Sequence, residues 1–264
     1  MGLLYRPAVE PRAGYFDEMV GADGSTTRPV YRRYREWFDT QEPARLLKKS
    51  SEAEALFRRT GITFNVYGDD EADERLIPFD IVPRVLAAGE WRRLSRGIEQ
   101  RVRAMNAFLH DIHHRQEILR AGRIPEELIA NSAAYLPPMI GVSPPGLVYT
   151  HVMGIDIVRT DEDEFYVLED NARTPSGVSY MLENRETMLQ MFPELFSTVR
   201  VQPVSNYPLH LRQSLAECAP SSTDGAPVVA VLTPGIHNSA YFLSLIHISE
   251  PTRRTIPSRM PSSA

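Results

Sequence analysis

Cysteine is nearly absent from this sequence, which has a single one, Cys218, among 264 residues. One cysteine cannot form a disulfide within the chain, so the fold must be held together without an internal disulfide framework. Its neighbours, LAECAP, include no histidine and no nucleophile motif. We therefore expect Cys218 to be a packed helix residue and not a reactive thiol.

Long apolar runs and an excess of positive charge are missing as well. No apolar stretch is long enough to span a bilayer, and residues 1–20 lack the charged and then apolar order of a signal peptide. The net charge is −5 at pH 7, whereas nucleic-acid binders usually present a basic face. These features predict a cytoplasmic protein that binds neither membranes nor nucleic acids.

What the chain does contain is enough apolar sequence, 42% of its residues, to build the core of one or two domains. Apolar residues recur every three or four positions in residues 90–121, which predicts a long helix that Gly122 ends. His110, His113 and His114 share one face of that helix, and we expect surface histidines there and not a metal site. Further helices are predicted at residues 31–37, 43–59, 183–195 and 208–219 and from residue 125 onward.

The most informative segment runs from Gly154 to Asn171 and reads GIDIVRTDEDEFYVLEDN. Two arms rich in Val, Ile, Phe and Tyr flank an acidic turn, which is typical of a β-hairpin. If Glu162 and Asp163 form the turn, Asp156 lies directly opposite Glu169. Because side chains alternate along a strand, Asn171 shares their face, while Asp170 points to the other one.

Two opposed carboxylates repel each other by roughly 3 kcal/mol at about 5 Å and an effective dielectric near 20, so a cation between them is expected. Oxygen ligands without His or Cys suit magnesium or manganese, which often also binds substrate phosphates. The same pattern also fits an ordinary acidic hairpin whose carboxylates face water, because the pairing register is an assumption.

The loop that follows, ARTPSGVS, combines a turn signal with hydroxyl groups and the fixed positive charge of Arg173. Backbone amides near Gly177 and the Arg173 guanidinium are suited to hold anionic oxygen. Taken alone, the same residues also fit a Pro-Gly connection that leads into the next helix.

The run LEDNARTPSGVSYMLENR, Leu168 to Arg185, resembles the signature of the circularly permuted ATP-grasp proteins of type 2, relatives of the ligase half of glutathionylspermidine synthase. The resemblance extends to GIDIVR, to PFDIVPR followed by EW, and to YFDEM near the start, and it covers residues 5–242. It implies an incomplete α/β fold of mixed α+β type, with a helical N-terminal part and a mixed sheet that carries the metal-site hairpin.

The resemblance also implies roles for individual residues. Asp156, Glu169 and Asn171 correspond to the residues that hold Mg2+, or Mn2+, against the phosphates of ATP. Arg173 is the candidate catalytic residue. The loop residues that are candidates for binding the cofactor phosphate, the substrate carboxylate or an acylphosphate are Ser176, Gly177 and Ser179.

The reaction that the resemblance implies is ATP-dependent ligation of a small-molecule or peptide carboxylate to an amine through an acylphosphate. Two other classes remain open. One is a non-catalytic scaffold or binding protein that keeps the fold. The other is a metal-dependent nuclease, although such enzymes use a Glu-x-Lys pair where this chain has Asn171.

The end of the chain differs from everything before it. Leu243 to Arg253, LSLIHISEPTR, reads as a translated sequencing adapter of the transposase type. We therefore expect residues 243–264 to be an artefactual, disordered tail, and we exclude them from reasoning about the fold. On this interpretation the chain is a truncated and inactive fragment of an enzyme, because the lysines and the adenine pocket of the nucleotide site belong to a missing C-terminal part.

Two portions are then predicted before the tail. Residues 1–220 form the N-terminal and metal-site portion, and residues 221–242 begin an interrupted α/β layer. That layer starts with the apolar strand Val228 to Leu232.

Overall fold

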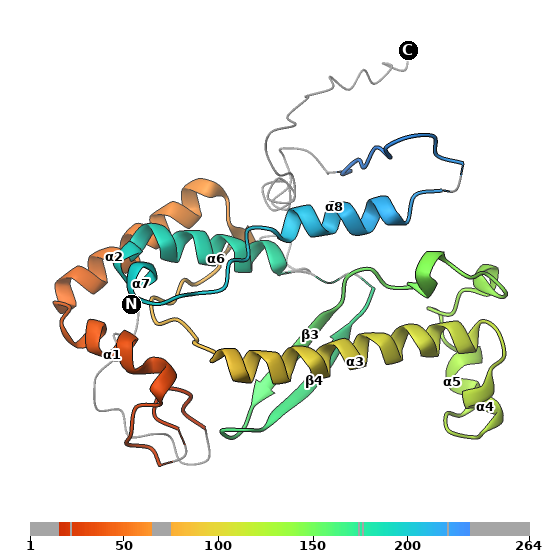
Figure 1. Cartoon of the computed structure of the whole chain (residues 1–264), viewed down its shortest axis with the longest axis horizontal. Coiled ribbons are helices and arrows are strands. Elements are labelled where there is room, and N and C mark those ends of the chain that lie inside the picture. The colour runs from red at the N-terminus through yellow and green to blue at the C-terminus, as the bar shows by residue number, and fades with distance from the viewer. Residues whose placement is uncertain are drawn as a thin grey trace.

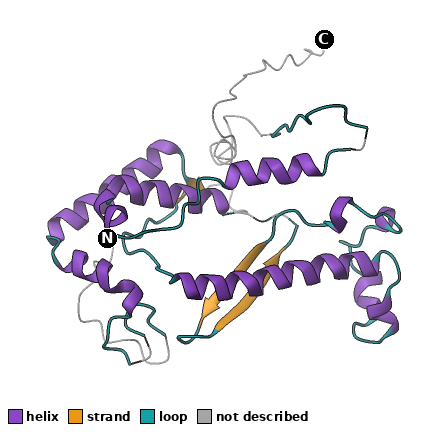
Figure 2. Ribbon diagram, viewed as in Figure 1, coloured by secondary structure: helices purple, strands orange, loops and turns teal. Residues whose placement is uncertain are grey.

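The computed structural model describes residues 16–21, 23–64, 75–173, 175, 177–220 and 222–232. Helices dominate these residues, and the strands are few and short (Figure 2). The helices are α1 (Arg32–Asp39), α2 (Pro43–Thr60), α3 (Ala88–Ile112), α4 (Glu117–Arg120), α5 (Glu126–Ala130), α6 (Val178–Met191), α7 (Pro193–Thr198) and α8 (Tyr207–Glu217), with 3-10 turns at Pro29–Tyr31, Pro137–Met139 and Pro145–Leu147. The strands are β1 (Thr63–Phe64), β2 (Arg75–Leu76), β3 (Gly154–Arg159) and β4 (Phe165–Asn171).

Helices α1, α2, α6 and α7 gather on one side of the molecule, and the long helix α3 extends away from them toward α4 and α5 (Figure 1). The strands pair as two separate antiparallel sheets within the described residues, β1 with β2 and β3 with β4. The β3–β4 hairpin crosses the line of α3 in Figure 1.

The hydrophobic core lies among α1, α2, α6 and α7. On α2, Leu46, Ala53 and Phe57 fall on one face at helical spacing, and all three are buried. The ring of Phe57 meets Phe79 edge-on at 5.3 Å between centroids. Phe192, fully buried at the start of α7, meets Trp37 of α1 in the same way at 5.2 Å. The core is therefore a packing of helices, and the β3–β4 hairpin lies outside it.

The predicted combination of helices and strands is confirmed, but the predicted mixed sheet is not present among the described residues. Residues Val228 to Leu232, expected to form a strand, are assigned to none, and Val228 and Leu232 are 94% and 99% exposed. A strand needs a neighbour to satisfy its backbone hydrogen bonds, and no described strand pairs with this segment. The domain limits stay predictions, and residues 243–264 lie outside the described part.

The long predicted helix ends nine residues earlier than its apolar pattern indicates. Helix α3 stops at Ile112, and Gln116 adopts a left-handed backbone conformation with φ of 55°. The Asp111 carboxylate accepts hydrogen bonds from the amides of Glu117 and Ile118, both at 2.9 Å, and these bonds hold the pKa of Asp111 below its ordinary value. A side chain that caps a new helix competes with continuation of the old one, which explains the break.

The prediction of surface histidines is wrong for His113, which is only 6% exposed. Its Nδ1–H donates to the carbonyl of Leu109 at 2.8 Å, and its ring stacks on Tyr135 at 4.9 Å. His110 and His114 are half-buried and stack on each other at 4.0 Å. Aromatic packing at the end of α3 therefore accounts for these histidines.

Cys218 is half-buried, and it directly follows α8, so it is the C-cap of that helix and not the residue within a helix that the sequence predicted. The structure also brings it a histidine that its neighbours in sequence did not indicate, because His151 Nε2 lies 2.9 Å from its Sγ. In the described part of the chain, no helix is both long enough and apolar enough to cross a bilayer.

Phe57→Ala should lower the free energy of unfolding by about 3–5 kcal/mol, because it removes a fully buried ring from the helical core. Leu47→Ala on the same helix is the matched control, since Leu47 is 45% exposed and should change that free energy by less than about 1 kcal/mol. Urea unfolding followed by circular dichroism measures both. Equal losses in the two variants would contradict this assignment of the core.

Candidate functional site

The hairpin places Asp156 directly opposite Glu169, as the sequence predicted. The route to this register differs from the predicted one. The turn consists of Asp161 to Asp163, because the Thr160 amide donates to the Glu164 carbonyl at 3.2 Å. A β-bulge then shifts the pairing by one residue, since Ile157 pairs with Val167 while Asp156 pairs with Glu169. The extra residue, Leu168, restores the carboxylate pair that a regular ladder from this turn would have misaligned.

The two faces of the hairpin differ in how their charges are balanced. On the face toward α3, the Asp170 carboxylate forms an ion pair with the guanidinium of Arg101, whose Nε lies 2.6 Å from Oδ1. This ion pair lowers the pKa of Asp170 below its ordinary value. On the other face Asp156 and Glu169 are both exposed, and no described side chain pairs with either carboxylate. The described part of the chain therefore supplies a cation on the face toward α3 and none on the face of Asp156 and Glu169.

The chemistry of this second face fits a hard divalent cation. Asp156 and Glu169 offer carboxylate oxygens, and Asn171 follows two positions later on the same strand with an amide oxygen. Their exposure leaves room for water and phosphate oxygens to complete the coordination of such an ion. Among the described residues, no group of three or more His, Cys, Asp or Glu side chains converges on a metal position, so an ion here would need ligands beyond these two carboxylates and the amide oxygen.

The loop after the hairpin folds back over its open end. A Cβ placed on Gly154 would lie only 3.2 Å from the Cβ of Pro175, so the proline packs on the first residue of β3, beside Asn171. Gly177 has φ of 101°, a backbone conformation that residues with a Cβ rarely adopt, and it directly precedes α6. This glycine lets the chain turn directly from the hairpin end into the helix.

The predicted site residues of the loop after the hairpin differ from one another in exposure. Arg173 is exposed in the bend after β4. Ser176 lies outside the described residues. Ser179 is 6% exposed within the first turn of α6, so its hydroxyl faces the interior of the protein. The N-cap residue of α6 is Gly177, which has no side chain, and the amides at the start of a helix are a general type of anion donor.

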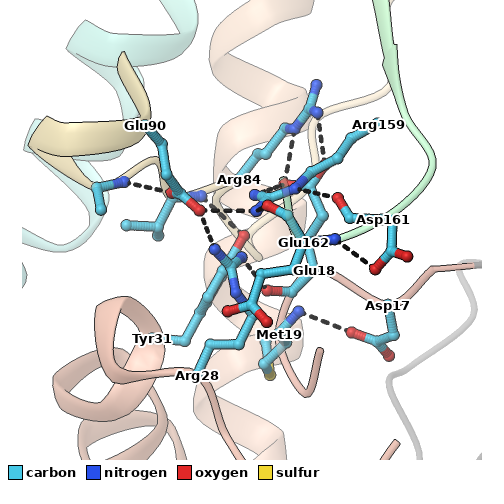
Figure 3. Close-up of polar contacts among 12 residues, drawn as sticks. Asp17, Glu18, Met19, Arg28, Tyr31, Arg84, Glu90, Arg159, Asp161 and Glu162 are labelled. Carbon is cyan, nitrogen blue, oxygen red and sulfur yellow. Dashed lines mark hydrogen bonds and ion pairs between the residues drawn. The ribbon is translucent and has the colours of Figure 1, made fainter. Parts of the chain in front are cut away.

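An ion cluster of five charged side chains anchors the turn end of the hairpin (Figure 3). Its members alternate in charge and are Arg84, Glu18, Arg159, Glu90 and Arg28. Glu18 is held by Arg84, with Nε to Oε2 at 3.0 Å, and its Oε2 lies 3.9 Å from Arg159 Nη1. Glu90 accepts from Arg159 Nη2 at 2.7 Å and also pairs with Arg28.

Arg159 is the member of the cluster that belongs to the hairpin. Its side chain is fully buried, between the rings of Phe16 and Phe165 at 5.1 and 5.0 Å. Its Nε also donates to the Asp161 carbonyl at 3.0 Å and its Nη2 to the Glu162 carbonyl, so it ties the turn to its own strand. The same side chain thus organises the turn and joins it to two other segments.

Glu90 links the cluster to the start of α3. Its Oε2 accepts from the Ala87 amide at 2.8 Å, which satisfies a backbone donor at the helix N-terminus. Burial acts to raise the pKa of Glu90, but the Ala87 hydrogen bond and the guanidiniums of Arg159 and Arg28 outweigh it and hold the pKa below its ordinary value. The carboxylate therefore stays charged at neutral pH.

Beyond the cluster, the hairpin and α3 diverge and leave an open groove of about 520 Å³ between them. Apolar side chains, among them Ile98 and Val167, line it, and the exposed ion pair of Arg93 with Asp163 lies at its edge. The hairpin is thus fastened to α3 by charged contacts and not by a continuous apolar interface.

Sequence reasoning did not find the ion cluster, although a signal for it was present. Four of the segments that carry the family resemblance are YFDEM, PFDIVPR, EW and GIDIVR, and each of these four contributes one member of the cluster. Those members are Glu18, Arg84, Glu90 and Arg159. Their convergence is a tertiary contact between residues up to 141 positions apart, as in the pair of Glu18 with Arg159, and no local pattern reports it.

Comparison with known proteins adds independent information. Residues 83–249, well over half of the chain, match the family described as "A circularly permuted ATPgrasp". An uncharacterized protein of Synechocystis is 43% identical over 228 residues, and one of Mycobacterium tuberculosis is 45% identical over 230 residues. A Frankia casuarinae protein named "Putative glutamate--cysteine ligase 2-2" is 37% identical over 227 residues.

Each of these matches covers 86% of the chain but a smaller share of the relative, namely 47%, 40% and 26% in the same order. The chain thus spans less than half the length of these curated relatives. The family match includes the hairpin that carries the carboxylate pair, the loop after it and α6. The chain belongs to the circularly permuted ATP-grasp family.

Proposed function

We propose that this chain is the metal-binding portion of an ATP-dependent ligase that joins a carboxylate to an amine through an acylphosphate. The observation that carries the proposal is the opposed pair Asp156 and Glu169, exposed on one hairpin face without a described cation. Membership of the ATP-grasp family supports the use of ATP. The Asn171 amide oxygen on the same face completes a set of donors suited to Mg2+ or Mn2+.

The protein groups divide the work by their chemistry. Asp156, Glu169 and Asn171 would hold the ion beside the phosphates, and Mg2+ supplies there the charge neutralisation that phosphoryl transfer requires. Arg173, exposed at the end of the hairpin, would hold anionic oxygen of the substrate carboxylate or the acylphosphate. Ser176, Gly177 and Ser179, at the turn into α6, are our candidates for contacts with the phosphate, the substrate carboxylate or the acylphosphate.

The reaction balances as two displacements. A substrate carboxylate oxygen attacks the γ-phosphorus of ATP, which releases ADP and leaves an acylphosphate. The amine nitrogen then attacks the acyl carbon, phosphate leaves, and the nitrogen loses a proton. The name of the Frankia relative, "Putative glutamate--cysteine ligase 2-2", is that of a ligase for glutamate and cysteine. We infer small carboxylate and amine substrates of that class for the full-length protein.

The carboxylate pair itself can be tested in the chain as it stands. Asp156→Asn should raise the free energy of unfolding without divalent metal by about 0.2–1 kcal/mol, because it removes a like-charge cross-strand contact. Mg2+ at about ten times its dissociation constant should stabilise the unsubstituted chain by about 1.4 kcal/mol and the variant much less. Thermal unfolding with and without MgCl2 measures both effects.

Glu162→Gln is the matched control for that experiment. Glu162 is an exposed acid in the turn of the same hairpin, away from the proposed metal face. Its substitution should leave the Mg2+ response intact. A Mg2+ response that survives Asp156→Asn as well would contradict the metal assignment.

Turnover tests the proposed function in a full-length protein that carries this chain. Glu169→Gln and Asp156→Asn should each lower ATP-dependent phosphate release by at least about 100-fold, since charge neutralisation by the metal is worth several kcal/mol in the transition state. Phosphate release with saturating ATP and MgCl2 is the measurement. Unchanged turnover in either variant would show that the pair does not serve the reaction.

Residues 1–242 alone should release no phosphate from ATP, because we assign no adenine-binding residue to them. A malachite green assay with MgCl2 is sufficient to detect activity. Magnesium-dependent hydrolysis by this segment, lost in its own Glu169→Gln variant, would show that the nucleotide site is complete within it.

A further inference from the structure

The β3–β4 hairpin depends on few contacts for its position. Of all the residues in its two strands, Arg159 is the one that is buried. Isolated two-stranded hairpins are marginally stable in water, so contacts from the rest of the protein must set where this one lies. Two of those contacts, Arg93 with Asp163 and Arg101 with Asp170, involve arginine side chains that are nearly half exposed. The Arg93 pair is screened by water and holds geometry weakly, whereas the bidentate pair of Arg101 with Asp170 is a firmer contact near the other end of the hairpin.

We propose that Arg159 is a positioning residue, whose buried guanidinium fixes the hairpin against the N-terminal segment and α3 and thereby sets the orientation of the Asp156 and Glu169 carboxylates. It contacts Glu18 on the N-terminal segment and Glu90 on α3, which ties three parts of the chain to one point. Asp156 lies three residues away on the same strand, about 10 Å along it. A change at the anchored end is therefore transmitted to the carboxylate face.

The geometry requires an arginine and not merely a positive charge. Nε donates to the Asp161 carbonyl, Nη2 donates to Glu90 and to the Glu162 carbonyl, and Nη1 faces Glu18. The planar group also lies between two aromatic rings. A lysine ammonium is a single point of charge and cannot make these contacts together. Arg159→Lys thus keeps the positive charge but removes the planar set of N–H donors that orients the hairpin relative to Glu18 and Glu90.

The cluster contains its own matched control. Arg28 is buried to the same extent as Arg159, pairs with the same Glu90, and donates to the Glu18 carbonyl at 2.7 Å. Its hydrogen bonds and ion pairs go to Glu18 and Glu90, and none goes to the hairpin. Substituting Arg28 therefore perturbs the cluster without releasing the hairpin. Arg93 provides the opposite control, an exposed arginine that does contact the hairpin turn.

The experiment compares Arg159→Lys, Arg28→Lys and Arg93→Lys in the chain of residues 1–264. Hydrogen exchange of the β3 and β4 amides reports hairpin position, and electron paramagnetic resonance reports the dissociation constant for Mn2+. Arg159→Lys should speed exchange in the hairpin by about tenfold while α2 keeps its protection. It should also weaken Mn2+ binding by about tenfold, the usual effect of losing a residue that orients metal ligands.

Arg28→Lys should lower the melting temperature at least as much as Arg159→Lys and leave hairpin exchange and Mn2+ binding unchanged, and Arg93→Lys should change none of the three. A purely structural role would make the two buried variants alike in all measurements. That result, or unaltered hairpin exchange in Arg159→Lys, overturns the proposal. Phe165→Leu removes one of the two aromatic rings that contact the Arg159 guanidinium, without a change of charge. It should also speed hairpin exchange and weaken Mn2+ binding, so it tests the proposal if Arg159→Lys does not fold.

The consequence for the metal rests on the proposed function, whereas the anchoring of the hairpin does not. The two measurements separate these statements. Fast hairpin exchange in Arg159→Lys with no Mn2+ binding by the unsubstituted chain would confirm the anchor and overturn both the metal site and its orientation by Arg159. Normal Mn2+ binding by a folded Arg159→Lys would leave the proposed function standing and overturn the positioning role.

Discussion

The buried guanidinium of Arg159 is the interaction on which the arrangement of this molecule depends. It meets Glu18 and Glu90 from two other parts of the chain, and those carboxylates are shared with Arg84 and Arg28. Buried charges are costly unless they are paired, and Glu18 and Glu90 supply the pairing that the Arg159 guanidinium needs. The result is a junction of the N-terminal segment, the start of α3 and the hairpin, in which Arg159 is the member that belongs to the hairpin.

The hairpin at this junction has one compensated face and one uncompensated face. Toward α3, Asp170 is neutralised by Arg101, whereas Asp156 and Glu169 on the other face have no described cation. Protein structures rarely oppose two carboxylates without a reason, because the arrangement lowers stability. The proposed site for a divalent cation and phosphate oxygens would supply that reason, and membership of the ATP-grasp family is consistent with it.

Much of the local structure follows from the sequence because it has local causes. The apolar period and the flanking Pro43 and Gly61 predict α2 closely, and alternation with an acidic turn predicts the hairpin. The pairing of Asp156 with Glu169 was predicted from a two-residue turn of Glu162 and Asp163, whereas the turn has three residues, Asp161 to Asp163. The bulge at Leu168 corrects the difference, and no sequence rule of propensity or period indicates where a bulge will fall.

The sequence by itself determined the type of most elements, the oxygen donors of the candidate metal face and the family resemblance, because each of these is written in neighbouring residues. Only the tertiary structure decided where α3 ends, that His113 is buried, and that four separated motifs meet in one ion cluster. The physical reason is that burial and ion pairing depend on which distant segments come together. The charge of Arg159 can be read from the sequence, but its partners exist only in the folded chain.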